Sequence, residues 1–551
     1  MTPLRRVCAL AAATLCSAPL LGRGALADGA LTAPPPGIQP TSLSLQDVLA
    51  AGERAAGVAQ DATATRIRTW AIAAYGLEGR STQIVRGDDL RDTITLGPFT
   101  QIRGVVDGKS WWQNENGLTV RETGIHQRDA VDERVLRDAR SNASVAGVRL
   151  LGEVKSPVDA YVVEVDPPGG RIEWLFYEVA TGRLVRKEAI VVDRRVVTTF
   201  DDFRTEGGAT EPWHYRIDDG RPANTEDWRE TSERLGAPST AADFAAPPDR
   251  LPVEFPAGTA ASRLPARFVN RKIVVRVTIG GRGFDFLLDS GSSGIVIDAA
   301  AAKSLGLQTF GKSVRETAGA YDETSALVPE LRVGDLRMRS VKVSVLPFEA
   351  NPVAGTEIVG LLGFDFIDSL VLRIDFEHET LEAYPSGWSA SMPPGAVGLR
   401  AALDDGVPDV TTEIDGVAAD HFIFDTGATS AVVFSAFADK HRDALADEGL
   451  GFALTRDHPF QSAGGVGGTM RVEPTQLRSF GAAGAQFRDF LAYVVRGSLS
   501  YEGEDQDGLL GYDYLRYFTV YLDERQSRVT LVRNGIPYAS PVQAATEEVL
   551  P

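Results

Sequence analysis

Two short stretches of the sequence place an aspartate in the same local setting. Residues 286–298 read FLLDSGSSGIVID and contain Asp289, and residues 422–434 read FIFDTGATSAVVF and contain Asp425. Each aspartate follows an apolar run and precedes a hydroxyl residue and a glycine. Two carboxyl groups at contact distance cannot both ionise, so they share one proton. Such a pair can accept a proton from water and donate one to a peptide carbonyl, which is general acid–base hydrolysis.

The residues after each aspartate have predicted supporting roles. We expect Gly291 and Gly427 to bring a backbone amide close to a carboxylate, through φ values that a larger residue would resist. The hydroxyls of Ser290 and Thr426 are expected to form hydrogen bonds across the two loops and to lock them together.

The third position after each aspartate differs between the two stretches. Ser292 is predicted to donate a hydrogen bond to the outer oxygen of its own aspartate, whereas Ala428 has no hydroxyl. This difference would break the symmetry of the pair and bias which carboxyl carries the shared proton.

The elements around each aspartate also repeat. A strand, a glycine-containing turn (Gly280-Gly281, then Asp415-Gly416) and a second strand lead to each aspartate. Helical stretches follow at 298–305 and 435–447, and each half closes with Leu-Leu-Gly, ending at Gly363 and at Gly511. Copies of about 130 to 150 residues predict two similar lobes that meet at a pseudo-twofold axis.

These motifs resemble those of the aspartic proteases of the pepsin and retropepsin type. The forms LLDSGSS and IFDTGAT, closed by LLGFDF and LLGYDY, are most similar to the retropepsin-like bacterial members, over about residues 261–532. The resemblance implies a mainly β, two-lobed protease fold with Asp289 and Asp425 as the catalytic pair. It also implies that the Leu-Leu-Gly segments ending at Gly363 and Gly511 pack beneath the aspartate loops. A hairpin flap over the substrate is implied as well. Residues 316–326, with Tyr321, and residues 462–470, with Gly464 and Gly465, lie where flaps would fall, although ordinary surface loops are the alternative.

The N-terminal half has a different pattern. Residues 43–64 predict an amphipathic helix, and residues 65–204 predict an antiparallel meander with turns at Asp107-Gly108 and Asn116-Gly117. A helix followed by a curved meander resembles the lipoprotein-carrier-like folds of the bacterial envelope, over about residues 43–220. That resemblance implies a concave sheet for an apolar ligand or a substrate segment; a packing or spacer domain is the alternative.

The expected domain organisation follows from these segments. Residues 1–27 are predicted to be a signal peptide, with Arg5 and Arg6 before an apolar run and Ala25-Leu26-Ala27 as the cleavage site. The expected order is then an N-terminal curved β-sheet accessory domain (28–234), a linker rich in proline and alanine (235–258), a first protease lobe (259–392) and a second lobe (393–551).

The signal peptide predicts an exported protein, periplasmic or secreted, with no membrane span once the signal is removed. An uncleaved anchor is the alternative. The two cysteines both lie in the signal segment, so the mature chain is expected to have no disulfide.

The net charge, the histidine spacing and one further motif narrow the classes of function that the sequence allows. A formal net charge of −19 argues against nucleic-acid binding. The six histidines lack the spacing of a metal site, so we expect no metal and no cofactor. Residues 306–313, GLQTFGKS, match a phosphate-loop pattern, but a predicted helix precedes them and a strand follows, which is the wrong context.

Two functions from different classes stay open. The first is an exported aspartic endopeptidase acting on peptide or protein substrates. The second is an envelope carrier or binding protein for apolar ligands or peptides, with a non-catalytic protease-like scaffold. Two carboxyl groups in glycine-tight loops favour the first, because a carrier has no need to bury charge there. Substrate preference and oligomeric state do not follow from the sequence.

Overall fold

The computed structural model gives the arrangement of most of the 551-residue chain. The residues that it describes are 32–57, 64–121, 131–132, 134–136, 138–139, 144–191, 194–250, 252–316, 320–347, 355–389, 391–404, 406–441, 461–465, 468–482, 484–495 and 506–539. The predicted signal peptide lies outside these ranges.

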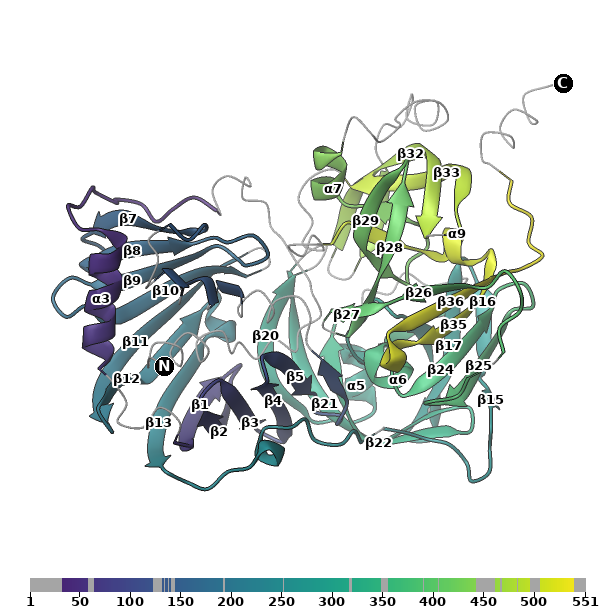
Figure 1. Cartoon of the computed structure of the whole chain (residues 1–551). Coiled ribbons are helices and arrows are strands. Elements are labelled where there is room, and N and C mark those ends of the chain that lie inside the picture. The colour runs from purple at the N-terminus through teal and green to yellow at the C-terminus, as the bar shows by residue number, and fades with distance from the viewer. Residues whose placement is uncertain are drawn as a thin grey trace.

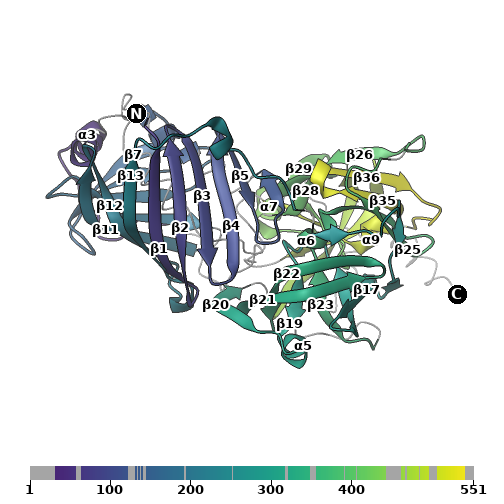
Figure 2. The same ribbon diagram turned by 90° about the horizontal axis from the view of Figure 1, so that it is seen from below.

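A broad antiparallel sheet forms the N-terminal part, and two β-rich lobes form the rest (Figure 1). The mainly β fold class, with a helix and a meander ahead of a second β region, is therefore confirmed. Figure 2 shows the N-terminal strands side by side as a curved wall next to the lobes.

In the described residues the N-terminal sheet has 13 strands, all paired antiparallel. In spatial order they are β6 (Thr119–Arg121), β5 (Lys109–Gln113), β4 (Phe99–Val106), β3 (Asp89–Leu96), β2 (Leu77–Arg86), β1 (Arg66–Ala74), β13 (Glu226–Leu235), β12 (Ala209–Asp218), β11 (Arg194–Glu206), β10 (Leu184–Val191), β9 (Glu173–Glu178), β8 (Ala160–Val165) and β7 (Val148–Val154). The meander thus continues beyond the predicted end at residue 204, because β13 returns to pair with β1.

Helix α3 (Leu45–Ala56) packs its apolar face on this sheet. It begins at a capping box, in which Ser44 and Asp47 satisfy each other's backbone amides. The prediction of a helix to residue 64 was too long. Gly57 ends the helix with φ at +68° and forms a bridge to Ala209, a conformation that favours glycine.

The first lobe is built on one sheet of nine strands within the described chain. They are β14 (Val253–Glu254), β22 (Leu336–Leu346), β19 (Val296–Asp298), β23 (Ile358–Leu362), β18 (Arg282–Leu288), β17 (Lys272–Ile279), β21 (Ala320–Val333) and β20 (Thr309–Glu316), with β16 (Ala266–Val269) paired to β17. Helices α5 (Ala299–Ser304) and α6 (Phe364–Ile367) follow β19 and β23.

The second lobe repeats this order on an eight-stranded sheet of described residues. Its strands are β27 (Ala402–Asp404), β28 (Val407–Ile414), β29 (Val417–Phe424), β34 (Gly508–Leu510), β30 (Val432–Val433), β33 (Phe487–Val495), β32 (Gly468–Ala482) and β31 (Gln461–Gly465), and its helices are α7 (Ser435–Lys440) and α9 (Tyr512–Leu515).

A third sheet joins the two lobes. Its order is β15 (Ser262–Arg263), β25 (Thr380–Pro385), β24 (Leu370–Asp375), β35 (Phe518–Asp523), β36 (Arg528–Arg533) and β26 (Val397–Arg400). Strands β24 and β35 come from different lobes and pair with each other, Leu372 opposite Leu522. A single apolar core runs from Val253 to Leu531 through both lobes, so the lobes form one packed unit.

The segment predicted to be a linker contacts its neighbours at specific residues. After β13 the chain forms η2 (Ala241–Asp243), and Phe244 is fully buried beneath the Arg86 guanidinium. Val253 then pairs with Met338 in the first lobe. This segment therefore contacts both the sheet that it leaves and the lobe that it enters.

Candidate active site

The hairpins that carry the two aspartates have the same construction. Strand β17 turns into β18 at Gly280-Gly281, where φ is +58° and +74°, and β28 turns into β29 at Asp415-Gly416, where φ is +52° and +87°. Positive φ at both turn residues is the geometry of a two-residue hairpin, whose twist matches the flanking strands. Each hairpin then delivers its aspartate at the end of its second strand.

The loops are supported from below by the Leu-Leu-Gly segments. The amide of Asp289 donates to the carbonyl of Leu362 at 3.0 Å, and the amide of Asp425 donates to that of Leu510 at 3.1 Å. These bonds extend the parallel pairing of β18 with β23 and of β29 with β34.

The closing glycines lie directly beneath the loops. A Cβ at Gly363 would stand 2.3 Å from the carbonyl oxygen of Ser292, and one at Gly511 would stand 2.4 Å from that of Ser430. Real Cβ atoms do not approach oxygen so closely, so both positions require glycine. The two halves thus use the same backbone contacts, as the repeat predicts.

Two hydroxyls tie the loops together across the lobes. The amide of Ser290 donates to Thr426 Oγ1, and the amide of Thr426 donates to Ser290 Oγ, each at 3.0 Å. Each hydroxyl in turn donates into the opposite lobe, Ser290 to the Phe424 carbonyl at 2.5 Å and Thr426 to the Leu288 carbonyl at 3.0 Å. All four groups are buried, so the structure contains the reciprocal lock that the sequence predicts.

Asp289 and Asp425 face each other above this lock, and their carboxyl groups hydrogen bond. A Cβ at Gly291 would lie 2.8 Å from Asp425 Cγ, and one at Gly427 would lie 2.5 Å from Asp289 Cγ. Each glycine therefore makes room for the opposite carboxyl. The prediction of unusual φ values was wrong, because neither glycine has positive φ and the requirement is space.

The backbone amides do approach the carboxylates, but unequally. Asp425 Oδ1 accepts from the amides of Gly427 at 2.7 Å and Ala428 at 2.9 Å. Asp289 Oδ1 accepts from the amide of Gly291 at 3.1 Å. The predicted role of Ser292 was wrong: its hydroxyl donates to the carbonyl of Gly294 at 3.0 Å, because the loop turns back on itself there. The asymmetry of the carboxyl pair therefore comes from the backbone amides, two of which donate to Asp425 and one to Asp289.

Burial and mutual charge shift the titration of the pair. Burial, followed by the charge of Asp425, raises the pKa of Asp289 to about 8. Burial also raises the pKa of Asp425, but Lys272 and the amides of Gly427 and Ala428 oppose that rise. The proton is therefore held more tightly by Asp289, and Asp425 is the carboxyl that ionises first.

Lys272 is a residue that the motif-based interpretation missed. Its Nζ donates to the carbonyl of Gly427, and its charge acts on both carboxylates. The pairing of the predicted hairpin could have indicated it. Val274 pairs with Leu287, so the same register places Lys272 opposite Asp289.

The predicted flaps are both hairpin strands. Tyr321 lies on β21, is 6% exposed, and packs with Leu287 and Leu361 beside the Asp289 loop. Gly464 and Gly465 lie on β31, opposite Thr469 and Gly468 of β32. Residues 317–319 and 466–467 lie outside the described residues. A role for these hairpins in covering substrate stays a prediction.

Side chains of the N-terminal part hold the first lobe beside this hairpin. Asn224 accepts from the Val314 amide at 2.8 Å and donates to the Val314 carbonyl at 3.0 Å. Asn116 makes the same pair of bonds, at the same two distances, with Lys342 on β22. Each amide side chain therefore bonds a backbone N–H and C=O of the first-lobe sheet as a neighbouring strand would.

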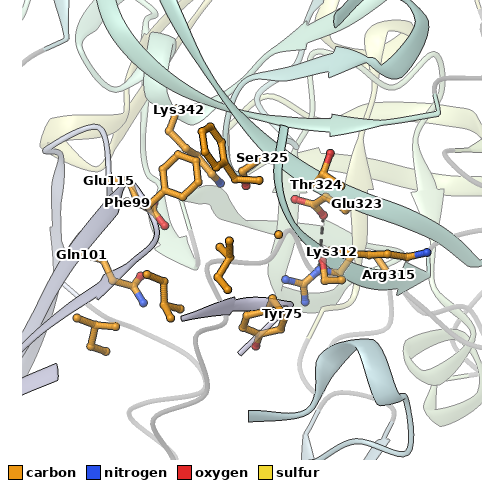
Figure 3. A pocket seen from close by; sticks show the side chains of 16 residues that line it. Tyr75, Phe99, Gln101, Glu115, Lys312, Arg315, Glu323, Thr324, Ser325 and Lys342 are labelled. Atoms are coloured by element: carbon orange, nitrogen blue, oxygen red, sulfur yellow. Dashed lines mark ion pairs between the residues drawn. The ribbon is translucent and has the colours of Figure 1, made fainter. Parts of the chain in front are cut away.

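A cavity of about 90 Å³ lies at this junction. Figure 3 shows Phe99 and Gln101 on one side of it, residues of β20 and β21, such as Lys312 and Glu323, on the other, and Tyr75 below Lys312. The Phe99 and Phe310 rings meet edge to face at 5.7 Å. The phosphate-loop match ends here on strand β20, which excludes the strand–loop–helix context of that motif.

A family comparison agrees with the two-lobed site. Residues 275–366 and 410–514 match the model of a family described as aspartyl protease. The two matched segments are thus similar to an aspartyl protease domain. The match starts on β17 and on β28 and ends in α6 and α9, so it covers both aspartate loops and both Leu-Leu-Gly supports.

Comparison with other proteins gives further likenesses. No curated protein matches the sequence. Among solved structures, a LolA superfamily protein from Nitrosomonas europaea is similar at 16% identity and a TM-score of 0.28, over 37% of this chain and 98% of that one. A DUF1329 family protein from Desulfovibrio piger is similar at 14% identity and a TM-score of 0.27, over 36% of this chain and 95% of that one.

Proposed function

We propose that the protein is an exported aspartic endopeptidase that hydrolyses peptide bonds with water activated by Asp289 and Asp425. The observation that carries this proposal is the paired carboxyls, which are buried, hydrogen bonded and locked by reciprocal bonds between the lobes. A scaffold without chemistry has no need for this arrangement, since burying two carboxyl groups together costs free energy.

The unequal amide bonds assign the roles within the pair. Asp425 is the carboxylate, because two amides stabilise its charge, and it takes a proton from the attacking water. Asp289 carries the shared proton and gives it to the carbonyl oxygen as the carbon–oxygen bond forms. Asp425 then gives the proton that it took from water to the leaving nitrogen. Asp289 takes a proton back from a hydroxyl of the tetrahedral intermediate as the carbon–nitrogen bond breaks, which restores the singly protonated pair.

The assignment predicts how activity depends on pH. Asp289 holds its proton up to a pKa of about 8, so hydrolysis should decline as the pH rises through about 8. It should also decline in acid, where Asp425 gains a proton and no base remains.

The test is to incubate the full chain with a diverse peptide mixture at pH 3 to 9 and to map the cuts by mass spectrometry. The matched control is Asp425→Asn, which keeps the shape of the side chain and removes the base. Cuts by the wild type that the control lacks support the proposal. Peptide binding without cuts in either protein would favour the carrier or binding function instead.

Export is part of the proposal and has its own measurement. In the described part of the chain, no helix is long and apolar enough to span a membrane. N-terminal sequencing of protein recovered from an exporting bacterial host should find a chain that begins at Asp28, after Ala27. A chain that keeps its first residues and stays with the membrane fraction would support the uncleaved anchor.

A further inference from the structure

The position of Lys272 is fixed by a tight hairpin. Strands β16 and β17 are joined at Asn270 and Arg271, which have φ of +48° and +55°, and Lys272 is the first residue after this turn. Extending the β17–β18 register by two residues from Val274 and Leu287 places Lys272 opposite Asp289. The side chain therefore starts beside the dyad on the first lobe.

The ammonium group reaches the second lobe. Nζ donates to the carbonyl of Gly427, whose own amide donates to Asp425. The Lys272 side chain thus connects strand β17 of the first lobe to the Asp425 loop of the second. This hydrogen bond is separate from those of the hydroxyl lock.

The charges around Lys272 are those of the dyad. Burial lowers the pKa of Lys272, and the charges of Asp425 and Asp289 oppose that change. In return, Lys272 is the cation that lowers the pKa of both carboxyls. The neighbouring Arg271 acts instead on Asp513 and Tyr493.

The sum of these charges has a chemical consequence. A dyad that shares one proton has a charge of −1, and the ammonium makes the buried group of three neutral. Burial alone favours the doubly protonated dyad, which has no base for water. A cation at contact distance opposes this by favouring the ionised form, typically by about 1 to 3 pH units for an adjacent opposite charge.

We propose that Lys272 is a positioning residue of the dyad. Lys272 binds the Asp425 loop and keeps one carboxyl of the dyad ionised at a lower pH than would be possible with an uncharged side chain in its place. The proposal rests on the proposed endopeptidase function. The proposed role of Lys272 is exerted through Asp289 and Asp425.

Two variants separate the charge from the shape. Lys272→Met keeps an unbranched apolar stem and removes the ammonium, and Lys272→Arg keeps a cation. The measurement is kcat/KM of the full chain against pH, on a peptide taken from the mapped cuts. We expect the acid limb of Lys272→Met to move up by about 1 pH unit or more, and that of Lys272→Arg to stay near the wild-type position.

Other outcomes contradict the proposal. If Lys272→Met loses activity equally at every pH and its acid limb does not move, Lys272 is only a structural hydrogen-bond donor. An unchanged profile at full activity would show that it has no role in the reaction.

A second readout needs no hydrolysis. Carboxyls with raised pKa favour the folded state below their ordinary pKa of about 4, and this stability is lost as the pH rises towards the folded value. Removing the cation raises the folded pKa of the dyad further, so the fall in Tm between pH 4.5 and pH 7.5 should be larger in Lys272→Met than in wild type. In a background of Asp289→Asn and Asp425→Asn the fall itself should be smaller, because the dyad that titrates is absent.

The two readouts distinguish the two proposals. No hydrolysis by any protein, with the expected Tm pattern, would reject the endopeptidase and keep the charge coupling of Lys272. Hydrolysis by wild type, with neither pH effect in Lys272→Met, would reject the coupling alone.

Discussion

The two lobes present the same loop to the dyad and differ in what lies around it. Opposite Asp289 the hairpin register places Lys272, whereas the corresponding position opposite Asp425 is Val407, which is 3% exposed in an apolar cluster. One lobe thus contributes a cation to the site and the other contributes packing. The repeat conserves the backbone of the site, while single side chains give the halves different electrostatic roles.

A second difference lies two residues after each closing glycine. Asp513 accepts from the amide of Ala431, at 2.8 Å, within its own lobe. Asp365 instead accepts from Asn114 Nδ2 of the N-terminal part, also at 2.8 Å, beside an apolar contact of Leu118 with Phe364. The first lobe therefore receives from the N-terminal part a bond that the second lobe makes within itself.

The largest expected effect tests whether the lobes act as one unit. Asp289→Asn and Asp425→Asn should each lower kcat about a thousand-fold or more, and the double variant should be little worse. Removing either carboxyl leaves no group pair that both accepts and donates a proton, so the losses should not add. Peptide turnover on the three purified variants is the measurement. Near wild-type turnover in Asp425→Asn would reject the shared dyad.

The Ser290 and Thr426 hydroxyls, one from each lobe, should contribute equally to the stability of the fold. Ser290→Ala and Thr426→Val each remove two cross-lobe bonds and leave a buried amide and a buried carbonyl unpaired. Each should lower the free energy of unfolding by about 1 to 3 kcal/mol. The exposed Thr411→Val is the control, with a change below about 0.5 kcal/mol. Urea denaturation measures the free energy of unfolding of all three variants. A loss of stability in only one of Ser290→Ala and Thr426→Val would contradict the reciprocal lock.

The Asn114 contact should matter in a pH-dependent way. Burial raises the pKa of Asp365 to about 6, so this carboxyl is ionised above that pH and accepts from Asn114. Asn114→Asp keeps the oxygen that receives the amides of Asn116 and Leu118, but places two carboxyls together. We expect a stability loss of about 1 to 3 kcal/mol at pH 7.5 and a smaller loss at pH 5, where Asp365 is protonated.

An exchange of the two residues sharpens this test. The double variant Asn114→Asp with Asp365→Asn restores one amide and one carboxyl and should recover most of the stability at pH 7.5. Thermal unfolding at the two pH values measures the recovery. If the single variant is equally unstable at both, the contact acts through packing and not through charge.

The smallest effect is expected outside both sites. Lys312 lies in the phosphate-loop match, but its side chain pairs with Asp322 at the surface, where both are more than half exposed. Lys312→Ala should change the free energy of unfolding by less than about 0.5 kcal/mol and leave peptide turnover unchanged. Specific ATP binding by the wild type that this variant lacks would contradict our interpretation of the motif.

The sequence by itself determined the doubled site. Each aspartate, its hydroxyl neighbour and its glycine lie within three consecutive residues, and the closing glycine recurs at a similar distance, so the pattern implies two hairpins and their supports. Residues next to each other in the chain must share a loop, which is why Ser290 and Thr426 were assigned to the lock from sequence. The helix and the meander were likewise visible in the periodicity of residues 43–204.

Only the tertiary structure decided the side-chain contacts that join distant segments. The hydroxyl of Ser292 turned away from Asp289 because the loop folds back to Gly294, and no local pattern fixes a hydroxyl torsion. Lys272 and Asn114 are ordinary polar residues in the sequence. Their roles depend on the register of a hairpin and on the docking of a separate sheet, where burial turns a single charge or amide into a determinant of the site.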